Sequence, residues 1–276
     1  MVVVAIATTL LSVAGCSSDT TASVDTTASS EPNATPSNET AKAMERLSGR
    51  YAHYDVVAYQ SADMKTLIIS YGFTDLYVED GELMAQESFC HAKHRSDQPI
   101  ETTMSDAATR AIKPIAAVTT LTSVGGKARV QRPETPTGIG IRLEDPANEE
   151  LPTDPNDPRV ADDDNDGKPG VTVRIKASEE LQGELYIARR ERFAYEVAEG
   201  TDATLTGTLT GTVTDKSEQL IVGASNPIFI TDKPWVQVED LSKSPIILIK
   251  QTKDWDCDRL EIERDKIFPE PPVVDW

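Results

Sequence analysis

Short apolar runs separated by polar turn residues make up most of the chain from about Leu47 onward. The clearest alternation is ATLTGTLTGTVT at 203–214, where Leu205, Leu209 and Val213 share one face with two glycines and threonines occupy the other. A period of two puts successive side chains on opposite faces of a strand, whereas a helix would scatter the same residues around its axis. The pattern therefore predicts a half-buried β-strand.

Turn signals divide the remaining apolar runs into further strands. Asp80-Gly81 and Gly125-Gly126 each lie between two strand-like runs, a pattern typical of tight hairpins. The good helix candidate is SDAATRAIKP at 105–114, where Ser105 can cap the first turn and Pro114 ends the helix. Further strands are predicted at 137–143, 171–176, 184–197, 218–223, 244–252 and 258–263.

This succession of strands with one short helix predicts an all-β fold. An antiparallel meander has to hide its edge strands, either by closing as a barrel or by pairing two sheets. The two glycines within 203–214 suit a bent strand in a barrel wall. We therefore expect a lipocalin-like antiparallel barrel, with a β-sandwich as the second choice, formed by a single β domain over residues 46–276.

The N-terminal segment has the pattern of an export signal. Its apolar run from Val2 to Leu11 is too short to span a bilayer. Val13-Ala14-Gly15-Cys16 resembles the bacterial lipobox, in which the leader is removed before the cysteine and the cysteine is acylated. This predicts a signal peptide over 1–15, lipidation of Cys16 and a membrane partner through the lipid anchor, with a plain signal peptide as the alternative. No Lys or Arg precedes the apolar run, which departs from the usual basic start of such a leader.

The residues after the lipobox have the composition of a tether. Residues 17–40 are almost entirely Ser, Thr, Asp, Asn, Ala, Glu and Pro, and such a segment cannot bury enough apolar surface to offset the entropy of ordering. We expect a flexible tether over residues 16–45. Ser17, in place of an aspartate after the cysteine, favours the outer membrane by analogy with bacterial lipoproteins.

Charge narrows the possible partners. The formal net charge of -19 repels phosphate backbones, so nucleic acid is excluded as an expected partner, and cations are favoured. Apart from Cys16, the chain has two cysteines, Cys90 and Cys257, which in an oxidising compartment predict one disulfide. The alternative is a zinc site in which Cys90 and His94 share a strand face and Cys257 joins them, while His91 points away.

The stretch of the sequence with the most candidate metal ligands is the acidic loop DPNDPRVADDDNDGKPG at 154–170. Asp162, Asp164 and Asp166 alternate before Gly167, in the register of the first half of an EF-hand calcium loop. Calcium takes six to eight oxygen ligands, and alternate carboxylates on a tight turn can point at one centre. Lys168 would contribute only its backbone carbonyl. The loop therefore predicts a structural calcium ion.

The second half of that calcium register is missing. Val173 stands where a bidentate glutamate belongs, and no helix is predicted on either side, so the missing ligand has to come from elsewhere. Asp157 and Asp154 are the nearest candidates, and Asp163 is expected to face away. The alternative is a solvated acidic surface loop, although crowded carboxylates repel one another unless a cation gathers them.

The same region carries a resemblance. PTDPNDPRVADDDNDGKPGVTVRI, GELYIARR and GASNP resemble segments of uncharacterised secreted or lipid-anchored proteobacterial proteins in which a DxDxDGxPGVTV stretch recurs. Asn165 stands where many of those loops have glycine. The resemblance implies a related envelope protein with an acidic loop before a strand, and it brings no activity or catalytic residue.

Catalytic motifs are scarce. The chain has three histidines and no nucleophile elbow, zinc-protease helix or phosphate-binding glycine loop. His53 and Asp55 fall on one strand face and could form a general-base pair, although a histidine satisfied by its neighbour fits equally well. We therefore expect a non-catalytic envelope lipoprotein that binds a partner protein or a small apolar ligand. A periplasmic hydrolase whose metal or acid/base site assembles in the fold is the alternative.

Overall fold

The computed structural model describes residues 37–61, 64–200, 207–231 and 233–276. The expected signal peptide, Cys16 and the first part of the tether therefore lie outside the described residues. From Pro36 onward the chain forms one compact unit. Its elements are α1 (Asn38–Leu47), β1 (Gly49–Gln60), β2 (Lys65–Glu79), β3 (Glu82–Ser96), β4 (Glu101–Met104), α2 (Asp106–Arg110), β5 (Ala117–Val118), β6 (Thr120–Val124), β7 (Lys127–Ile139), β8 (Val171–Lys176), β9 (Gln182–Glu199), β10 (Thr208–Ala224), η2 (Pro227–Phe229), β11 (Val236–Gln237), η3 (Leu241–Lys243), β12 (Pro245–Lys250) and α3 (Cys257–Ile267).

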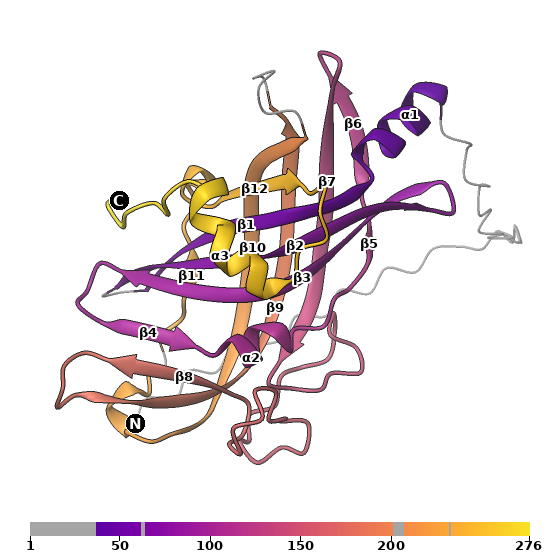
Figure 1. The fold of residues 1–276 in the computed structure, drawn as a ribbon. Coiled ribbons are helices and arrows are strands. Elements are labelled where there is room, and N and C mark those ends of the chain that lie inside the picture. The colour runs from indigo at the N-terminus through magenta and orange to yellow at the C-terminus, as the bar shows by residue number, and fades with distance from the viewer. Residues whose placement is uncertain (1–36, 62–63, 201–206, 232) are drawn as a thin grey trace, which may run out of the picture. The chain divides into compact units, whose positions relative to one another are not determined.

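All strands of this unit belong to one antiparallel sheet that curls into a half-barrel (Figure 1). Its main path runs β4-β8-β9-β10-β12-β1-β2-β3-β5, and β1 pairs with the late strand β12 on one side and with β2 on the other. One edge of the long strand β9 pairs first with β8 and then with β7. The all-β class with few helices is confirmed. No described helix is both long and apolar enough to cross a membrane.

The two faces of β1 and β2 pack against different partners. One face is apolar and is covered by the C-terminal helix α3, whose Leu260 is fully buried there (Figure 1). Phe268, just after α3, stacks on Tyr54 with ring centroids 5.4 Å apart. The opposite face lies inside the half-barrel, where apolar side chains surround a band of buried polar groups that includes His53 and Asp55.

The two predicted hairpins are confirmed. The β2–β3 hairpin turns at Asp80 and Gly81, which adopt φ angles of 51° and 83°, and the β6–β7 hairpin turns at Gly125 and Gly126, with φ angles of 60° and 79°. Positive φ at both central residues matches the twist of the flanking strands. The helix predicted at 105–114 is present as α2, and Ser105 caps it by accepting a hydrogen bond from the Ala108 amide.

Some local predictions differ from the structure. The strand predicted at 258–263 is helix α3: Leu260 and Ile262 suggested alternation, but Leu260 is fully buried and Ile262 is 62% exposed, as a helix requires. The strand predicted at 218–223 continues β10 and is not a separate element. The last residues of the expected tether, 38–45, belong to helix α1, which buries Met44. The part of the predicted 203–214 strand before Gly207 lies outside the described residues, and the rest belongs to β10.

A β-bulge in β3 changes which side chains share a face. The β2–β3 register shifts where Tyr71 pairs with His91 and Gly72 pairs with Phe89, so that Cys90 is the extra residue. Gly72 is required at this point, because a Cβ there would lie 2.1 Å from the Ser88 carbonyl oxygen. A bulge inserts one residue and reverses the alternation beyond it.

Candidate functional site

The acidic loop between β7 and β8 is held against the domain by Asp163. Asp163 accepts a hydrogen bond from the Gly140 amide at 2.7 Å and pairs with Arg142 at 2.5 Å, and its own amide donates to the Gly170 carbonyl. Asn165 and Gly167 take positive φ angles of 57° and 84°, which close the turn. Asp163 thus faces away from the other carboxylates, as predicted, and holds the loop against the sheet.

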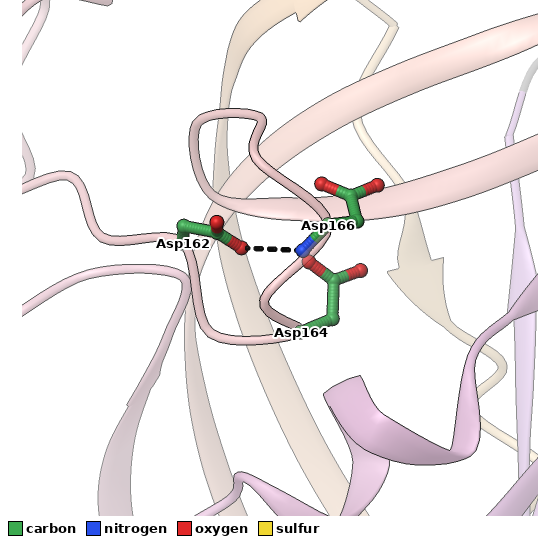
Figure 2. A group of neighbouring side chains, drawn as sticks. All are labelled: Asp162, Asp164 and Asp166. Carbon is green, nitrogen blue, oxygen red and sulfur yellow. Dashed lines mark hydrogen bonds between the residues drawn. The ribbon is translucent and has the colours of Figure 1, made fainter.

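The other three aspartates converge. Carboxylate oxygens of Asp162, Asp164 and Asp166 all lie within 4.8 Å of one another (Figure 2). Asp162 accepts from the amides of Asp166 and Gly167 at 3.1 and 2.9 Å, which bends the backbone around the group. The structure therefore brings together the three carboxylates that the alternating pattern singled out.

Thr172, at the start of β8, orients two of these carboxylates. Its amide donates to Asp164 Oδ2 at 3.0 Å, and its hydroxyl donates to Asp166 Oδ2 at 2.6 Å. Asp164 is 9% exposed, and its buried Oδ1 has no hydrogen-bond partner within the described part of the chain. Burial raises the pKa of Asp164, and the neighbouring Asp166 and Asp162 raise it further. An unsatisfied buried carboxylate oxygen is costly unless a cation binds it.

Asp157 and Lys168, the two other residues of the predicted ligand set, make contacts of their own. Asp157 is engaged by Arg159, whose Nε and Nη2 lie 2.9 and 3.0 Å from its two oxygens, so it does not join the cluster. The Lys168 ammonium donates to Glu184 at 2.6 Å and lies 3.5 Å from Asp166 Oδ2, while its amide donates to Asp166 Oδ1. Lys168 therefore already neutralises part of the charge on Asp166.

The three carboxylates of this cluster provide hard oxygen ligands for a cation on a surface turn. Calcium accepts carboxylate oxygens and water together in a flexible coordination shell, whereas magnesium demands a nearly ideal octahedron. Three carboxylates are enough to hold such an ion when water completes the shell.

The predicted general-base pair of His53 and Asp55 is formed, but both side chains are buried. His53 Nε2 lies 2.8 Å from Asp55 Oδ2, and His53 Nδ1 lies 2.7 Å from the Thr74 hydroxyl. His53 is fully buried, as is Thr74, and both ring nitrogens are occupied. This matches the alternative interpretation of a histidine satisfied by its neighbours.

The two cysteines form the predicted disulfide, and the zinc alternative is wrong. Cys90 and Cys257 are bonded, with Cα atoms 5.3 Å apart. The bulge at Cys90 places this sulfur on the outer face, beneath α3, while His94 lines the interior. His91 has other partners: its Nε2 donates to the Cys257 carbonyl at 3.2 Å, and its Nδ1 lies 3.0 Å from Asp106 Oδ2.

A charged cluster that is not among the predicted sites lies inside the half-barrel. On β9, Arg190 and Arg192 point outward, and Arg190 pairs there with Glu218 at 2.5 Å. The inward set of the same strand is Arg189 and Glu191, whose side chains lie 2.7 Å apart, with Asp215 of β10 close by. The alternation of RRERF was the available signal, since it puts Arg189, Glu191 and Phe193 on one face.

The comparisons with known proteins do not place the chain in a family. Neither the protein-family models, nor the curated proteins, nor the solved structures give a match to it.

Proposed function

We propose that this chain is a non-catalytic, lipid-anchored envelope protein whose β domain is braced by a calcium ion and binds a small ligand or a partner protein. The observation that carries the calcium part is the convergence of Asp162, Asp164 and Asp166, with a buried Asp164 oxygen that lacks a donor in the described structure. A divalent cation at this point would reduce the repulsion among the carboxylates, and it would bind the Asp164 oxygen that has no hydrogen-bond donor in the described structure.

A non-catalytic role is supported by the hydrogen bonding and burial of two of the three histidines, His53 and His91. His53 has both ring nitrogens bonded and no exposure, so it cannot reach a substrate without opening the core. His91 is held by the Cys257 carbonyl and Asp106. General-base catalysis needs a ring nitrogen within reach of the substrate proton, which neither histidine offers.

Calcium is expected to raise the thermal midpoint of the protein. At a hundredfold excess over Kd, one site contributes about 2.7 kcal/mol, which corresponds to about 5 °C or more for a domain of this size. The Asp164→Ala variant should lose this response, because it removes the most buried ligand. The measurement is differential scanning calorimetry of the metal-free protein with added calcium or magnesium.

Asp154→Ala is the matched control, since Asp154 lies on the same loop but outside the cluster of three carboxylates, and its side chain accepts hydrogen bonds from Asn156. This variant should keep the calcium response. A midpoint that does not move at millimolar calcium, or that moves equally in Asp164→Ala, would overturn the calcium part of the proposal.

The anchor is tested separately. In a Gram-negative host, the full chain is expected in the detergent phase after phase separation, and the Cys16→Ala variant in the aqueous phase, because two acyl chains give stable membrane attachment. The readout is immunoblotting of both phases. Equal partitioning of the two proteins would contradict acylation at Cys16.

A further inference from the structure

A cavity of about 80 Å³ lies inside the half-barrel, between β1, β9, β10 and the strands facing them. Part of its wall is apolar, formed by side chains such as Ile139, Val171 and Ile187. The remainder carries ionisable groups from three strands, which are Asp55, Arg189, Glu191 and Asp215. An apolar wall with a few convergent polar groups is typical of small-molecule sites, and a cavity of this size admits only a very small ligand.

The ionisable groups are organised around one guanidinium. Arg189 Nη2 lies 2.7 Å from Glu191 Oε1 and 3.8 Å from Asp215 Oδ2, and it also donates to the Tyr59 hydroxyl at 3.4 Å. Tyr59 in turn donates to Asp215 Oδ2. Asp215 is 4% exposed, and its Oδ1 accepts no hydrogen bond from any residue that the structure describes.

Negative charge exceeds positive charge around the cavity. Asp55 is hydrogen-bonded to His53 at 2.8 Å, so Glu191 and Asp215 share the one guanidinium of Arg189. His94, which also lines the cavity, stays neutral because burial and the nearby Arg189 lower its pKa to about 4. Burial raises the pKa of Glu191 to about 7, despite the opposing effect of Arg189, and Asp215 and Asp55 raise it further. A cation that binds beside a buried carboxyl with a raised pKa favours its ionised form.

A single metal ion does not account for the excess of negative charge around the cavity. Among the residues that the structure describes, the ligand atoms of three acidic or histidine side chains come within 4.8 Å of one another only in the 162–166 loop. The carboxylates of the cavity are therefore too far apart to share one ion. An organic cation is longer, and its apolar part can contact the apolar wall while its charge faces the acids.

We propose that the cavity binds a small primary ammonium compound, with its charged end toward Glu191 and Asp215 and its alkyl part along Ile139, Val171 and Ile187. A water molecule needs about 10–15 Å³ by the same measure of volume, so the cavity has room for about five to eight non-hydrogen atoms. An ammonium group has three donors, and Asp215 Oδ1 and His94 Nδ1 are two acceptors without partners in the described structure. This inference rests on the ligand-binding part of the proposed function and is independent of calcium.

Binding should depend on pH with a defined sign. The groups that face Glu191 are Arg189 on its own strand, Asp215 on β10, Asp55 and Tyr59 on β1, and His94 on β3. An ammonium ion favours the ionised form of Glu191, whose pKa is about 7 in the free protein. Affinity is therefore highest above that value and falls as the pH drops through it. Between about pH 8 and pH 6 we expect roughly tenfold weaker binding.

The test is isothermal titration calorimetry of the whole protein with n-butylammonium, and with n-butanol and butyrate as probes of nearly the same shape. At about pH 8 butylammonium is charged, as a lysine side chain is. We expect butylammonium to bind and the other two probes not to bind. The Glu191→Gln variant should bind at least tenfold more weakly, whereas Glu196→Gln, an exposed carboxylate on the outer face of β9, should bind like the wild type.

Equal binding of n-butanol, stronger binding of butyrate, or no binding of butylammonium would each overturn the proposal. The pH series on the wild type provides a readout that does not depend on any variant folding, and an affinity that is constant between about pH 6 and pH 8 would also contradict it. Asp164→Ala should bind butylammonium normally. The two experiments are therefore independent. Loss of the calcium response would not affect butylammonium binding, and absence of butylammonium binding would not affect the calcium response.

Discussion

Loss of the Cys90–Cys257 disulfide is expected to lower the free energy of unfolding by about 3–5 kcal/mol. The two cysteines are 167 residues apart in the sequence. In the chain-entropy model, closing a loop of that length restricts the unfolded chain by about 5 kcal/mol at most, and measured losses are commonly smaller. The measurement is urea unfolding of the wild type and of a Cys90→Ala, Cys257→Ala double variant.

The control is urea unfolding of both proteins in the presence of a reducing agent. Reduction should destabilise the wild type and leave the double variant unchanged, since that variant has no bond at this site to lose. Identical urea midpoints for the oxidised wild type and the double variant would contradict the expected contribution. In the double variant, hydrogen exchange should accelerate first in α3, because the disulfide joins the first residue of this helix to β3.

The Arg132→Leu variant is expected to lose about 3–5 kcal/mol of stability, because it leaves a buried carboxylate without its partner. Arg132 Nε lies 2.6 Å from Glu87 Oε2, and the side chains are 5% and 3% exposed. Tyr195 donates to the other Glu87 oxygen at 2.9 Å. Urea unfolding at neutral pH measures the loss, and Arg129→Leu is the control: Arg129 lies on the same strand and forms an exposed pair with Glu196.

The pH dependence of this loss has a predictable sign. Burial raises the pKa of Glu87 above its ordinary value of 4.5, and Arg132 opposes that rise. A carboxyl whose pKa is raised on folding favours the folded state at acid pH and loses that contribution as the pH rises through the folded pKa. Removing Arg132 raises this pKa further. The stability gap between wild type and Arg132→Leu should therefore be smaller at about pH 5 than at pH 8, and a gap that widens in acid would contradict this explanation.

Local patterns predicted most of the sheet. Hairpins at Asp80-Gly81 and Gly125-Gly126 follow from residues that tolerate positive φ, and the strands at 171–176 and 184–197 follow from alternation. The strand predicted at 258–263 is wrong because Leu260 and Ile262, two positions apart, span too few residues to distinguish a strand from one turn of helix. Asp256, whose side chain accepts from the Arg259 amide, was the signal that marks this helix start.

The two candidate sites differ in how far the sequence could reveal them. The acidic cluster is local, since Asp162, Asp164 and Asp166 lie within five consecutive positions, and the alternating pattern alone singled them out. The interior cluster joins Tyr59 to Arg189 across 130 residues and to Asp215 across 156. Only the pairing of distant strands brings such groups together, and one sequence does not define that pairing.

The pairing of β1 with β12 has a kinetic consequence. The N-terminal strand β1 finds one neighbour at once in β2, but its other neighbour is Pro245–Lys250, almost two hundred residues later. A chain that leaves a ribosome or a translocation channel N-terminus first therefore holds an open sheet edge until nearly all of it has emerged. Such a high contact order predicts folding in milliseconds to seconds, after synthesis and not during it.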